Sequence, residues 1–378
     1  MKKIALGMSG GVDSSLCAHL LVEQGYEVTG VYLECWRAPG CRSEEDRADA
    51  LKVALSLGIP FQVLDFKDTY KNKVVEYFFE QYQAGLTPNP DVLCNKEIKF
   101  GLFYDWALSH GFDAVATGHY ARITQETETH IPHLAIPTDT HKDQTYFLYL
   151  LKQEQLAHII FPLSELTKPQ VRIEAEKRGL HVADKKDSVG ICFIGDINVH
   201  NFLEERLGTN PGEVIDTRGN VIGKHQGLWF YTVGQRHGFE INARTLVRES
   251  DGREIEKDNI PPFYVIKKLA ATNQLLVGFG AETYMDQFSV AAIHWIGAPP
   301  ALRAKDDQGR EEKLLVRIRH TGKLIPCTLH KTITDTNEEL LIIQLEEAIQ
   351  GIAEGQSAVF YTQKEGIVLC LGGGIISA

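Results

Sequence analysis

The sequence predicts an α/β protein, with a parallel-sheet domain followed by a small, mostly β domain and a C-terminal β-barrel. In the first half of the chain, short apolar runs alternate with segments of helical periodicity, as in a parallel sheet covered by helices on both faces. After Gly208 only short strand-like runs separated by turns follow, and their length favours a small barrel over a sandwich. We therefore expect domains at residues 1–207, 208–280 and 281–378.

The elements of the first domain are predicted from their periodicity. Strands are expected at Ile4–Met8, Glu27–Leu33, Phe61–Asp65 and Ala114–Thr117, with a short strand-like segment at Ser188–Ile194. Helices are expected at Leu16–Val22, Ser43–Leu57, Tyr70–Tyr82, Asn95–His110, Thr145–Leu151, Lys168–Lys177 and Asp196–Leu207. Because ligands bind such sheets beyond the carboxyl ends of the strands, the loops after Met8, after Leu33 and at Gly118 are candidate binding segments.

The rest of the chain is predicted to be β structure. Glycine and asparagine turns predict hairpins at Glu213–Ile222 and Phe263–Val277. Barrel strands are expected at Phe288–Trp295, Leu314–His320, Leu340–Leu345, Ala358–Tyr361 and Val368–Leu371.

The composition is that of an ordinary soluble protein, with 43% apolar and 24% charged residues among 378. No apolar run approaches the roughly 18 residues that a membrane-spanning helix needs. The N-terminus also lacks the pattern of a signal peptide. We therefore expect a cytoplasmic protein without a membrane partner.

The charge distribution leaves room for RNA binding. The net charge of −11 argues against a large nucleic-acid surface. Residues 313–331, however, hold five basic residues and no acid, and residues 168–186 hold six basic residues against three acids. These stretches are either solvated faces or an RNA footprint.

The loop after the first strand has the features of an anion site. It reads Ser9-Gly10-Gly11-Val12-Asp13-Ser14-Ser15. Two glycines allow backbone N–H groups to approach an anion, and a helix N-terminus follows them. Asp13 can cap that helix or hold a metal ion. The loop matches neither G-x-x-x-x-G-K-[ST] nor G-x-G-x-x-G, so the common phosphate loop and a dinucleotide fold are both disfavoured.

Two of the seven cysteines are candidates for chemistry. The set contains no C-x-x-C and is widely spaced, so we predict neither a disulfide scaffold nor a zinc ribbon. Cys94 lies near a predicted helix N-terminus, where the dipole and Lys96 favour the thiolate, and Asp91 can accept or donate a proton. Cys192 follows Gly190 in an apolar segment. Each alone is compatible with packing, but the pair suggests thiol–disulfide exchange.

The string S-G-G-x-D-S resembles the loop of the ATP pyrophosphatases (PP-loop enzymes, with a Rossmann-like domain), which split ATP into AMP and pyrophosphate. Together with further strings it resembles the bacterial tRNA-specific 2-thiouridylases, in order and over nearly the whole chain. The further strings are Asn89–Asn95, Ala116–Ala121, Lys142–Leu148, Gly190–Gly195, Tyr231–Arg236 and Gly355–Tyr361.

The resemblance implies roles for individual residues. The ATP-binding set is Gly7, Met8, Ser9, Gly10, Gly11, Val12, Asp13 and Ser14, with Leu33 and Gly118 near the adenosine. Asn89, Pro90 and Asp91 are expected to face the target uracil. The expected tRNA contacts are His119, Lys142, Asp143, Gln144, Arg319, His320 and Gln356. The family usually has an aromatic residue after the barrel arginine, so His320 is a departure.

The resemblance also implies a mechanism with ATP and Mg²⁺. ATP would adenylate O2 of the wobble uridine in a tRNA anticodon loop, with release of pyrophosphate. Sulfur from a persulfide on Cys192 would then replace the AMP, while Cys94, as nucleophile, forms a transient disulfide with Cys192. The partners would be tRNA and a cysteine desulfurase or sulfur-relay protein that donates the persulfide.

Three alternatives stay open at this point. A PP-loop enzyme that transfers nitrogen, such as an amide or guanidine synthetase, leaves both cysteines without a role. A non-catalytic tRNA-binding module leaves the loop and the cysteines unexplained. An iron–sulfur cluster on Asp91, Cys94 and Cys192 is a further route, which we rank below the cluster-free one.

Overall fold

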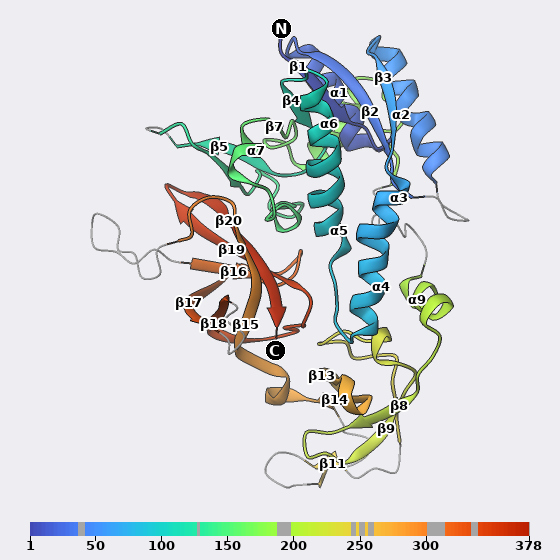
Figure 1. The fold of residues 1–378 in the computed structure, drawn as a ribbon, viewed down its shortest axis with the longest axis vertical. Coiled ribbons are helices and arrows are strands. Elements are labelled where there is room, and N and C mark those ends of the chain that lie inside the picture. The colour runs from blue at the N-terminus through green and yellow to red at the C-terminus, as the bar shows by residue number, and fades with distance from the viewer. Residues whose placement is uncertain are drawn as a thin grey trace.

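The computed structural model describes residues 1–36, 42–126, 129–186, 198–242, 247–248, 254–255, 261–300, 314–333 and 339–377. It contains a parallel-sheet domain at the top of Figure 1, a barrel below it and a small β domain at the bottom. The predicted fold class is therefore confirmed. No helix in these ranges is long and apolar enough to cross a membrane.

The first domain is built on a five-stranded sheet in the order β3-β2-β1-β4-β7. Its strands are β1 (Lys3–Gly7), β2 (Glu27–Glu34), β3 (Phe61–Asp65), β4 (Ala114–Ala116) and β7 (Ile159–Ile160). All of its strand pairs are parallel. The strand order reverses at β1, so the crevice beyond the carboxyl ends of β1 and β4 is where this fold binds ligands.

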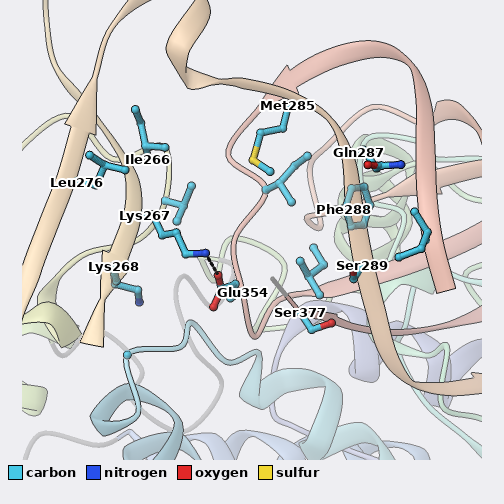
Figure 2. A pocket seen from close by; sticks show the side chains of 15 residues that line it. Ile266, Lys267, Lys268, Leu276, Met285, Gln287, Phe288, Ser289, Glu354 and Ser377 are labelled. Carbon is cyan, nitrogen blue, oxygen red and sulfur yellow. Dashed lines mark ion pairs between the residues drawn. The ribbon is translucent and has the colours of Figure 1, made fainter. Parts of the chain in front are cut away.

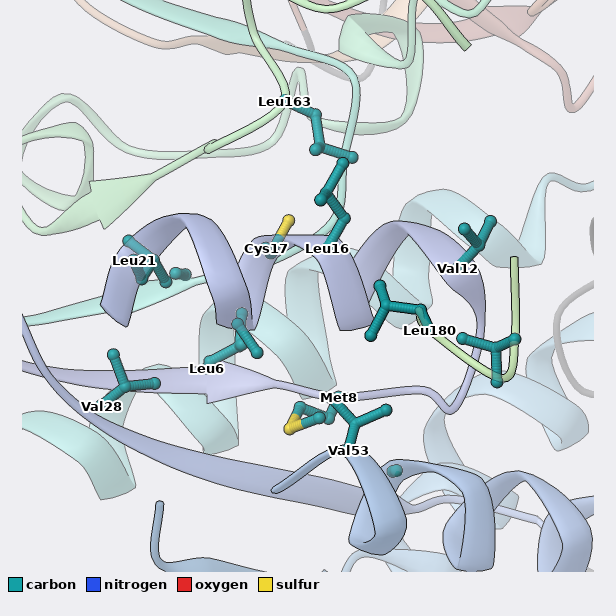
Figure 3. Packing of buried hydrophobic residues seen from close by; sticks show 14 of the residues in the cluster. Leu6, Met8, Val12, Leu16, Cys17, Leu21, Val28, Val53, Leu163 and Leu180 are labelled. Carbon is teal, nitrogen blue, oxygen red and sulfur yellow. The ribbon is translucent and has the colours of Figure 1, made fainter. Parts of the chain in front are cut away.

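Helices cover both faces of the sheet. On one face lie α1 (Val12–Glu23), α2 (Ser43–Leu57) and α8 (Lys168–Lys177). Figure 3 shows their apolar cluster, in which Leu6 and Met8 from the first strand and the loop after it lie with Leu16 and Val53. On the other face, Phe100, Phe103 and Ala107 pack against Ala5 and Val115 of the strands.

The chain around Cys94 differs from the predicted helix. We expected a helix from Asn95, but a helical run begins five residues earlier, at Pro90. It comprises α5 (Pro90–Leu93), η2 (Cys94–Leu102) and α6 (Phe103–Ser109). Proline suits the first helical position because the N–H it lacks would have no partner there. The expected helix at Thr145–Leu151 is only the 3₁₀ turn η3 (Thr145–Phe147).

The remaining helices are α3 (Lys67–Tyr70), η1 (Lys71–Val75), α4 (Glu76–Gln83), α7 (Gln153–Leu156) and α9 (Val199–Leu207). They agree with the prediction where they are described, except α7, which we did not predict. Asn198 caps α9, with Oδ1 accepting from the N–H of His200 at 2.8 Å. The predicted Asp196 cap and the segment Ser188–Ile194 lie outside the described residues.

The central domain confirms both predicted hairpins. Its main sheet has the order β10-β9-β8-β14-β13. The strands are β8 (Gly212–Ile215), β9 (Val221–His225), β10 (Glu240–Ile241), β13 (Tyr264–Leu269) and β14 (Gln274–Gly278), and a separate ladder joins β11 (Val247–Arg248) to β12 (Glu254–Ile255). The connection from β13 to β14 turns at Asn273, whose φ is +51°.

The third domain is a closed antiparallel barrel of six strands, because β15 pairs with both β18 and β20. The strands are β15 (Tyr284–Trp295), β16 (Leu314–Arg317), β17 (Ile325–Ile333), β18 (Glu339–Gln350), β19 (Ser357–Lys364) and β20 (Ile367–Ser377). We did not predict β17. The barrel closes tightly at Gly372, where a Cβ atom would lie 2.1 Å from the carbonyl oxygen of His294.

The barrel is joined to the first domain by a shared sheet. A hairpin that we did not predict, β5 (Arg122–Gln125) and β6 (Pro132–Ala135), pairs with the barrel strand β20. Beside it, Arg317 of the barrel donates to Asp143 of the first domain at 2.5 Å, and both side chains are buried. The other Asp143 oxygen accepts from the N–H and the hydroxyl of Thr145. The two domains are therefore linked through a buried ion pair.

Removing one member of this pair should destabilise the protein. In Arg317→Met the Asp143 carboxylate stays buried without its cation, so the free energy of unfolding should fall by about 3–5 kcal/mol in urea denaturation. Adding Asp143→Asn removes the stranded charge and keeps the oxygen that accepts from Thr145. The double variant should therefore recover most of the loss, and a double variant as unstable as Arg317→Met would show that charge is not the cause.

Candidate functional site

The loop between β1 and α1 has a backbone that accepts only glycine at Gly10. Its φ is +75°, and a Cβ atom there would lie 2.0 Å from the carbonyl oxygen of Asp46. Gly11 has φ of −90°, and its Cβ would meet nothing closer than Ser9 Oγ at 3.6 Å. Inside the loop, Ser14 Oγ accepts from the N–H of Ser9 at 3.1 Å. The loop is thus closed on itself and pressed against α2.

Lys185 links this loop to α2. Its Nζ donates to the carbonyl oxygen of Gly10 at 3.0 Å and to the carboxylates of Asp46 and Asp49 at 2.7 Å each. Burial lowers the pKa of Lys185, but these hydrogen bonds outweigh it and raise the pKa above its ordinary value. Because the bracing uses a carbonyl, it does not consume the N–H groups that an anion needs.

A cavity of about 210 Å³ lies over the loop and the N-terminus of α1. In the described structure, no side chain caps this helix at Gly11. Four lysines and two aspartates line the cavity, which makes its lining positive. The lining residues are Ser9, Gly11, Val12, Asp13, Asp46, Tyr120, Lys142, Gln144, Lys168, Lys185 and Lys186. An open helix N-terminus with a surplus of lysines suits a polyphosphate.

Lys168 and Asp13 form the charged centre of the cavity. Lys168 Nζ donates to both Asp13 carboxylate oxygens, at 2.8 and 2.7 Å. The Tyr120 hydroxyl donates to one of the same oxygens at 2.9 Å. The Lys168 backbone N–H donates to Asp139 at 2.7 Å, which fixes the start of α8. The lysine is thus held at the cavity with its charge already balanced.

Most of the residues predicted to hold ATP lie in or beneath the crevice between β1 and β4, and Leu33 does not. Ser9, Gly11, Val12 and Asp13 line the cavity, while Gly7, Met8, Gly10 and Ser14 form the strand end and loop beneath it. Gly118 lies directly against α1, since a Cβ there would be 3.0 Å from the Ser14 nitrogen. Leu33 lies near the end of β2 and packs in two apolar clusters. Their contacts with ATP remain a proposal.

Cys94 is buried, with 3% of its surface exposed. It lies one turn inside the helix that starts at Pro90, rather than at its end, so the helix N-terminus is farther from it than we expected. Lys96, the cation expected to favour its thiolate, pairs with Glu97 at 3.3 Å. The Asp91 carbonyl accepts from Asn95 at 3.0 Å. Cys192 lies outside the described residues.

The base-facing segment Asn89–Asp91 sits at the meeting point of the domains. Asn89 forms a side-chain hydrogen bond with the Tyr146 hydroxyl, which donates to the Ser357 carbonyl of the barrel at 2.9 Å. Burial raises the pKa of Tyr146 far above its ordinary value, so the hydroxyl remains a donor. Gln356 Nε2 donates to the Thr87 carbonyl at 2.9 Å, just before this segment.

The expected tRNA contacts fall into different environments. Lys142 and Gln144 line the phosphate cavity, and Gln144 Oε1 also accepts from the N–H of Tyr120 at 2.9 Å. Asp143 is engaged in the buried pair with Arg317. The contacts of these residues with tRNA therefore remain predictions, with a structural role already visible for Asp143 and Gln144.

His119 is buried and electrically neutral. Burial, with a smaller effect from Lys99, lowers its pKa well below the ordinary value. The neutral ring accepts from Lys99 at Nε2 (3.3 Å), so Nδ1 carries the proton and donates to Thr117 at 2.8 Å. With 7% of its surface exposed, His119 is placed to support the β4 loop.

Arg319 and His320 lie at the end of β16. Arg319 is exposed, while the His320 ring lies 4.4 Å from that of Phe147 between ring centroids. Burial lowers the pKa of His320 although Asp143 opposes it, and His320 Nδ1 has no hydrogen-bond partner in the described structure. Contact of Arg319 and His320 with tRNA therefore stays a prediction.

Five residues that line the cavity were not predicted as part of the site: Asp46, Tyr120, Lys168, Lys185 and Lys186. Tyr120 lies in one of the strings that carry the resemblance, and Lys168 and Lys185 belong to the basic stretch at 168–186. That stretch suggested an RNA footprint, but these two lysines are turned to the anion loop instead. The sequence showed only that lysines are concentrated at residues 168–186 of an acidic chain. It did not show that Lys168 and Lys185 face the anion loop.

The fold and the site together define a PP-loop enzyme that uses ATP: a parallel sheet with an anion loop at its switch point, carrying two β domains. Family models match the chain in three consecutive parts. They are a tRNA methyl transferase HUP domain at residues 2–196, a tRNA methyl transferase PRC-barrel domain at 200–279 and an aminomethyltransferase beta-barrel domain at 285–376.

Curated relatives match over the full length. The chain is 39% identical to the tRNA-specific 2-thiouridylase MnmA of Pediococcus pentosaceus, over 100% of this chain and 95% of the relative. It is 41% identical to the protein of that name from Lysinibacillus sphaericus, over 99% of this chain and 94% of the relative. The chain therefore belongs to the tRNA-specific 2-thiouridylase family, a family of enzymes, and the resemblance seen in its motifs is confirmed.

Solved structures match about half of the chain. A 4-thiouridine synthetase in complex with RNA and bound ATP is 18% identical, with a TM-score of 0.37, over 54% of this chain and 50% of that one. NMN synthetase from Francisella tularensis is 20% identical, with a TM-score of 0.31, over 49% of this chain and 66% of that one.

Alanine should destabilise the protein at Gly10 but not at the adjacent Gly11. Gly10→Ala forces a Cβ into the Asp46 carbonyl, so we expect the melting temperature to fall and ATP binding to be lost, as measured by calorimetry. Gly11→Ala has room and an ordinary φ, so its melting temperature should stay near that of the unsubstituted chain. Equal destabilisation by both changes would contradict this account of the loop.

Proposed function

We propose that this protein uses ATP to convert the wobble uridine of a tRNA into 2-thiouridine. The segment Lys142–Gln144 carries the argument. Lys142 and Gln144 line the phosphate cavity, and Asp143 between them binds the barrel through Arg317. A barrel that docks RNA is thereby connected through three consecutive residues to the place where ATP is cleaved.

In the first step, the uracil O2 attacks the α-phosphate of ATP and pyrophosphate leaves. Negative charge then accumulates on the β- and γ-phosphates, above the open N-terminus of α1. Lys168 and Lys185 supply fixed positive charge at this point, and each is already oriented by carboxylates. The structure therefore supports the loop as the leaving-group site.

Mg²⁺ fits this site as a companion of ATP. Among the described residues, no group of three His, Cys, Asp or Glu side chains is arranged to hold a metal. Mg²⁺ commonly needs only one or two carboxylates when phosphates supply the other ligands. Asp13 is the carboxylate in the cavity suited to this, and the ion would neutralise charge on the departing pyrophosphate.

The second step replaces AMP with sulfur. We propose that the terminal sulfur of a Cys192 persulfide attacks C2 of the adenylated uridine and that AMP departs with the oxygen. The Cys94 thiolate then attacks Cys192 Sγ, which breaks the persulfide bond and leaves a Cys94–Cys192 disulfide for an external thiol to reduce. Asp91 is the proposed proton acceptor near Cys94, and a cysteine desulfurase or a sulfur-relay protein is the proposed donor.

The RNA contacts complete the proposal. The target base must leave its stack to reach a pocket between domains, and Asn89, Pro90 and Asp91 are proposed to receive it. Arg319, His320 and Gln356 of the barrel, with His119 and the Lys142–Gln144 segment, are proposed to hold the anticodon arm. Because Gln356 already binds the Thr87 carbonyl, RNA bound there would act directly on the base-facing segment.

Serine at either proposed catalytic cysteine should block sulfur transfer without preventing the binding of ATP and tRNA. Cys94→Ser and Cys192→Ser should lower the transfer of labelled sulfur to tRNA by about a thousandfold or more, while ATP and tRNA still bind. Cys35→Ser is the matched control, because Cys35 packs in the same apolar cluster as Cys94 and has no proposed role. Normal thiolation by Cys192→Ser would overturn the persulfide mechanism.

Arg319→Ala should weaken tRNA binding and lower the slope of log affinity against log salt by about 1, with ATP affinity unchanged. Lys52→Ala, which removes another exposed charge, on α2, serves as the control and should leave the slope unaltered. Filter binding over a series of salt concentrations measures both. An unchanged slope in Arg319→Ala would place the RNA footprint elsewhere.

A further inference from the structure

The segment Leu86–Pro88, which leads into the base-facing residues, is held by the other two domains. The Thr87 N–H donates to the Glu354 carbonyl of the third domain at 2.9 Å, and the Thr87 carbonyl accepts from Gln356 at 2.9 Å. The contact is close, since a Cβ at Gly355 would lie 2.8 Å from the Thr87 nitrogen. The position of this segment therefore depends on domains outside its own.

Lys268 of the central domain adds a third link. Its Nζ donates to the Leu86 carbonyl at 3.2 Å, to the Thr87 hydroxyl at 3.1 Å and to the Tyr231 carbonyl at 3.1 Å. An ammonium has three N–H donors, so these three oxygens use all of them. Tyr231 belongs to the central domain and is itself fixed by its hydroxyl, which donates to the Gly238 carbonyl at 2.7 Å.

The neighbouring lysine shows that this arrangement is specific. Lys267 reaches Glu354 at 3.6 Å and keeps about half of its side chain exposed. Figure 2 shows Lys267 directed to Glu354 while Lys268 points to a different side. Beside them lies a cavity of about 360 Å³, lined mainly by apolar side chains such as Ile266 and Phe288. Two adjacent lysines thus have different surroundings, and only Lys268 binds the segment.

Enclosing most of an ammonium group between domains is costly, because the group loses much of its hydration. Burial lowers the pKa of Lys268 to about 8, although the nearby Glu354 carboxylate opposes the shift. An apolar side chain would fill the same space without this cost. The three donors, rather than the volume of the side chain, are therefore what the site uses.

We propose that Lys268 is a positioning residue, whose ammonium ties the central domain to Leu86–Pro88 and thereby sets the place of Asn89, Asp91 and Cys94 during the reaction. Its kinetic consequence rests on the proposed thiolation, but the link itself does not. Since Lys268 contacts neither the ATP cavity nor Cys94 in the described structure, it acts through the segment that precedes them.

The test compares Lys268→Met, Lys268→Arg and the control Lys267→Met. Lys268→Met should lower the single-turnover rate of tRNA thiolation by about tenfold to a hundredfold, with the KM for ATP unchanged within about twofold. Lys268→Arg keeps the charge and the donors, and the adjacent cavity gives room for its larger head group, so it should restore most of the rate. Lys267→Met should behave as the unsubstituted enzyme.

The pH profile supplies a readout that a purely structural role would not change. Deprotonation removes one donor from a group that serves three oxygens, so the rate should fall as the pH rises through about 8. The segment Leu86–Pro88 and Tyr231 face Lys268 with carbonyl and hydroxyl oxygens, and Glu354 is the charged group acting on it. In Lys268→Arg this decline should disappear. A decline that persists unchanged in Lys268→Arg would overturn the proposal, even if Lys268→Met does not fold.

Hydrogen–deuterium exchange of residues 84–94 tests the link without any turnover. Exchange there should be faster in Lys268→Met than in the unsubstituted enzyme and in Lys267→Met. Unchanged exchange would overturn the proposal whatever the enzyme's activity is. If the unsubstituted enzyme fails to thiolate tRNA while the exchange result holds, the proposed function is wrong and the link between the domains is right.

Discussion

The site depends on one constraint: an anion loop must be held in shape without using the N–H groups that will bind the anion. The protein meets this largely through carbonyl oxygens, although the Ser9 N–H donates to Ser14 Oγ. Lys185 donates to the Gly10 carbonyl, and the Ser15 hydroxyl donates to the Gly11 carbonyl at 2.8 Å. The helix α1 likewise begins without a side-chain cap in the described structure. The resulting loop is firm and still has donors for phosphate oxygens.

A second constraint follows from the first, since lysines gathered around the loop repel one another. The structure balances them with carboxylates: Lys168 is paired with Asp13, and Lys185 with Asp46 and Asp49. Hydrogen bonds from Lys185 and His181 lower the pKa of Asp49, although burial opposes this. The lysines are therefore fixed before the polyphosphate arrives, and little rearrangement is needed when it does.

Sequence reasoning found what depends on local pattern and missed what depends on distant pairing. The helix Ser43–Leu57, the hairpin around Ala271–Asn273 and the glycine loop each carry their signal within a few residues. The strand β17 was missed because Pro326 interrupts its alternation, and the β5–β6 hairpin because its strands have four residues each. Lys168 and Asp13 are 155 residues apart, so no local pattern could join them.

Contacts between residues that are far apart in sequence also make the three domains depend on one another. The loop proposed to bind phosphate is completed by its own domain, but the segment before Cys94 is bound by Lys268 of the central domain and Gln356 of the barrel. Parts of the chain that lie far apart in sequence thereby set the geometry of a few residues in the first domain. Chemistry that needs a base, a nucleotide and a sulfur in one place would gain from this arrangement, because the proposed RNA docking and the proposed base positioning share the same contacts.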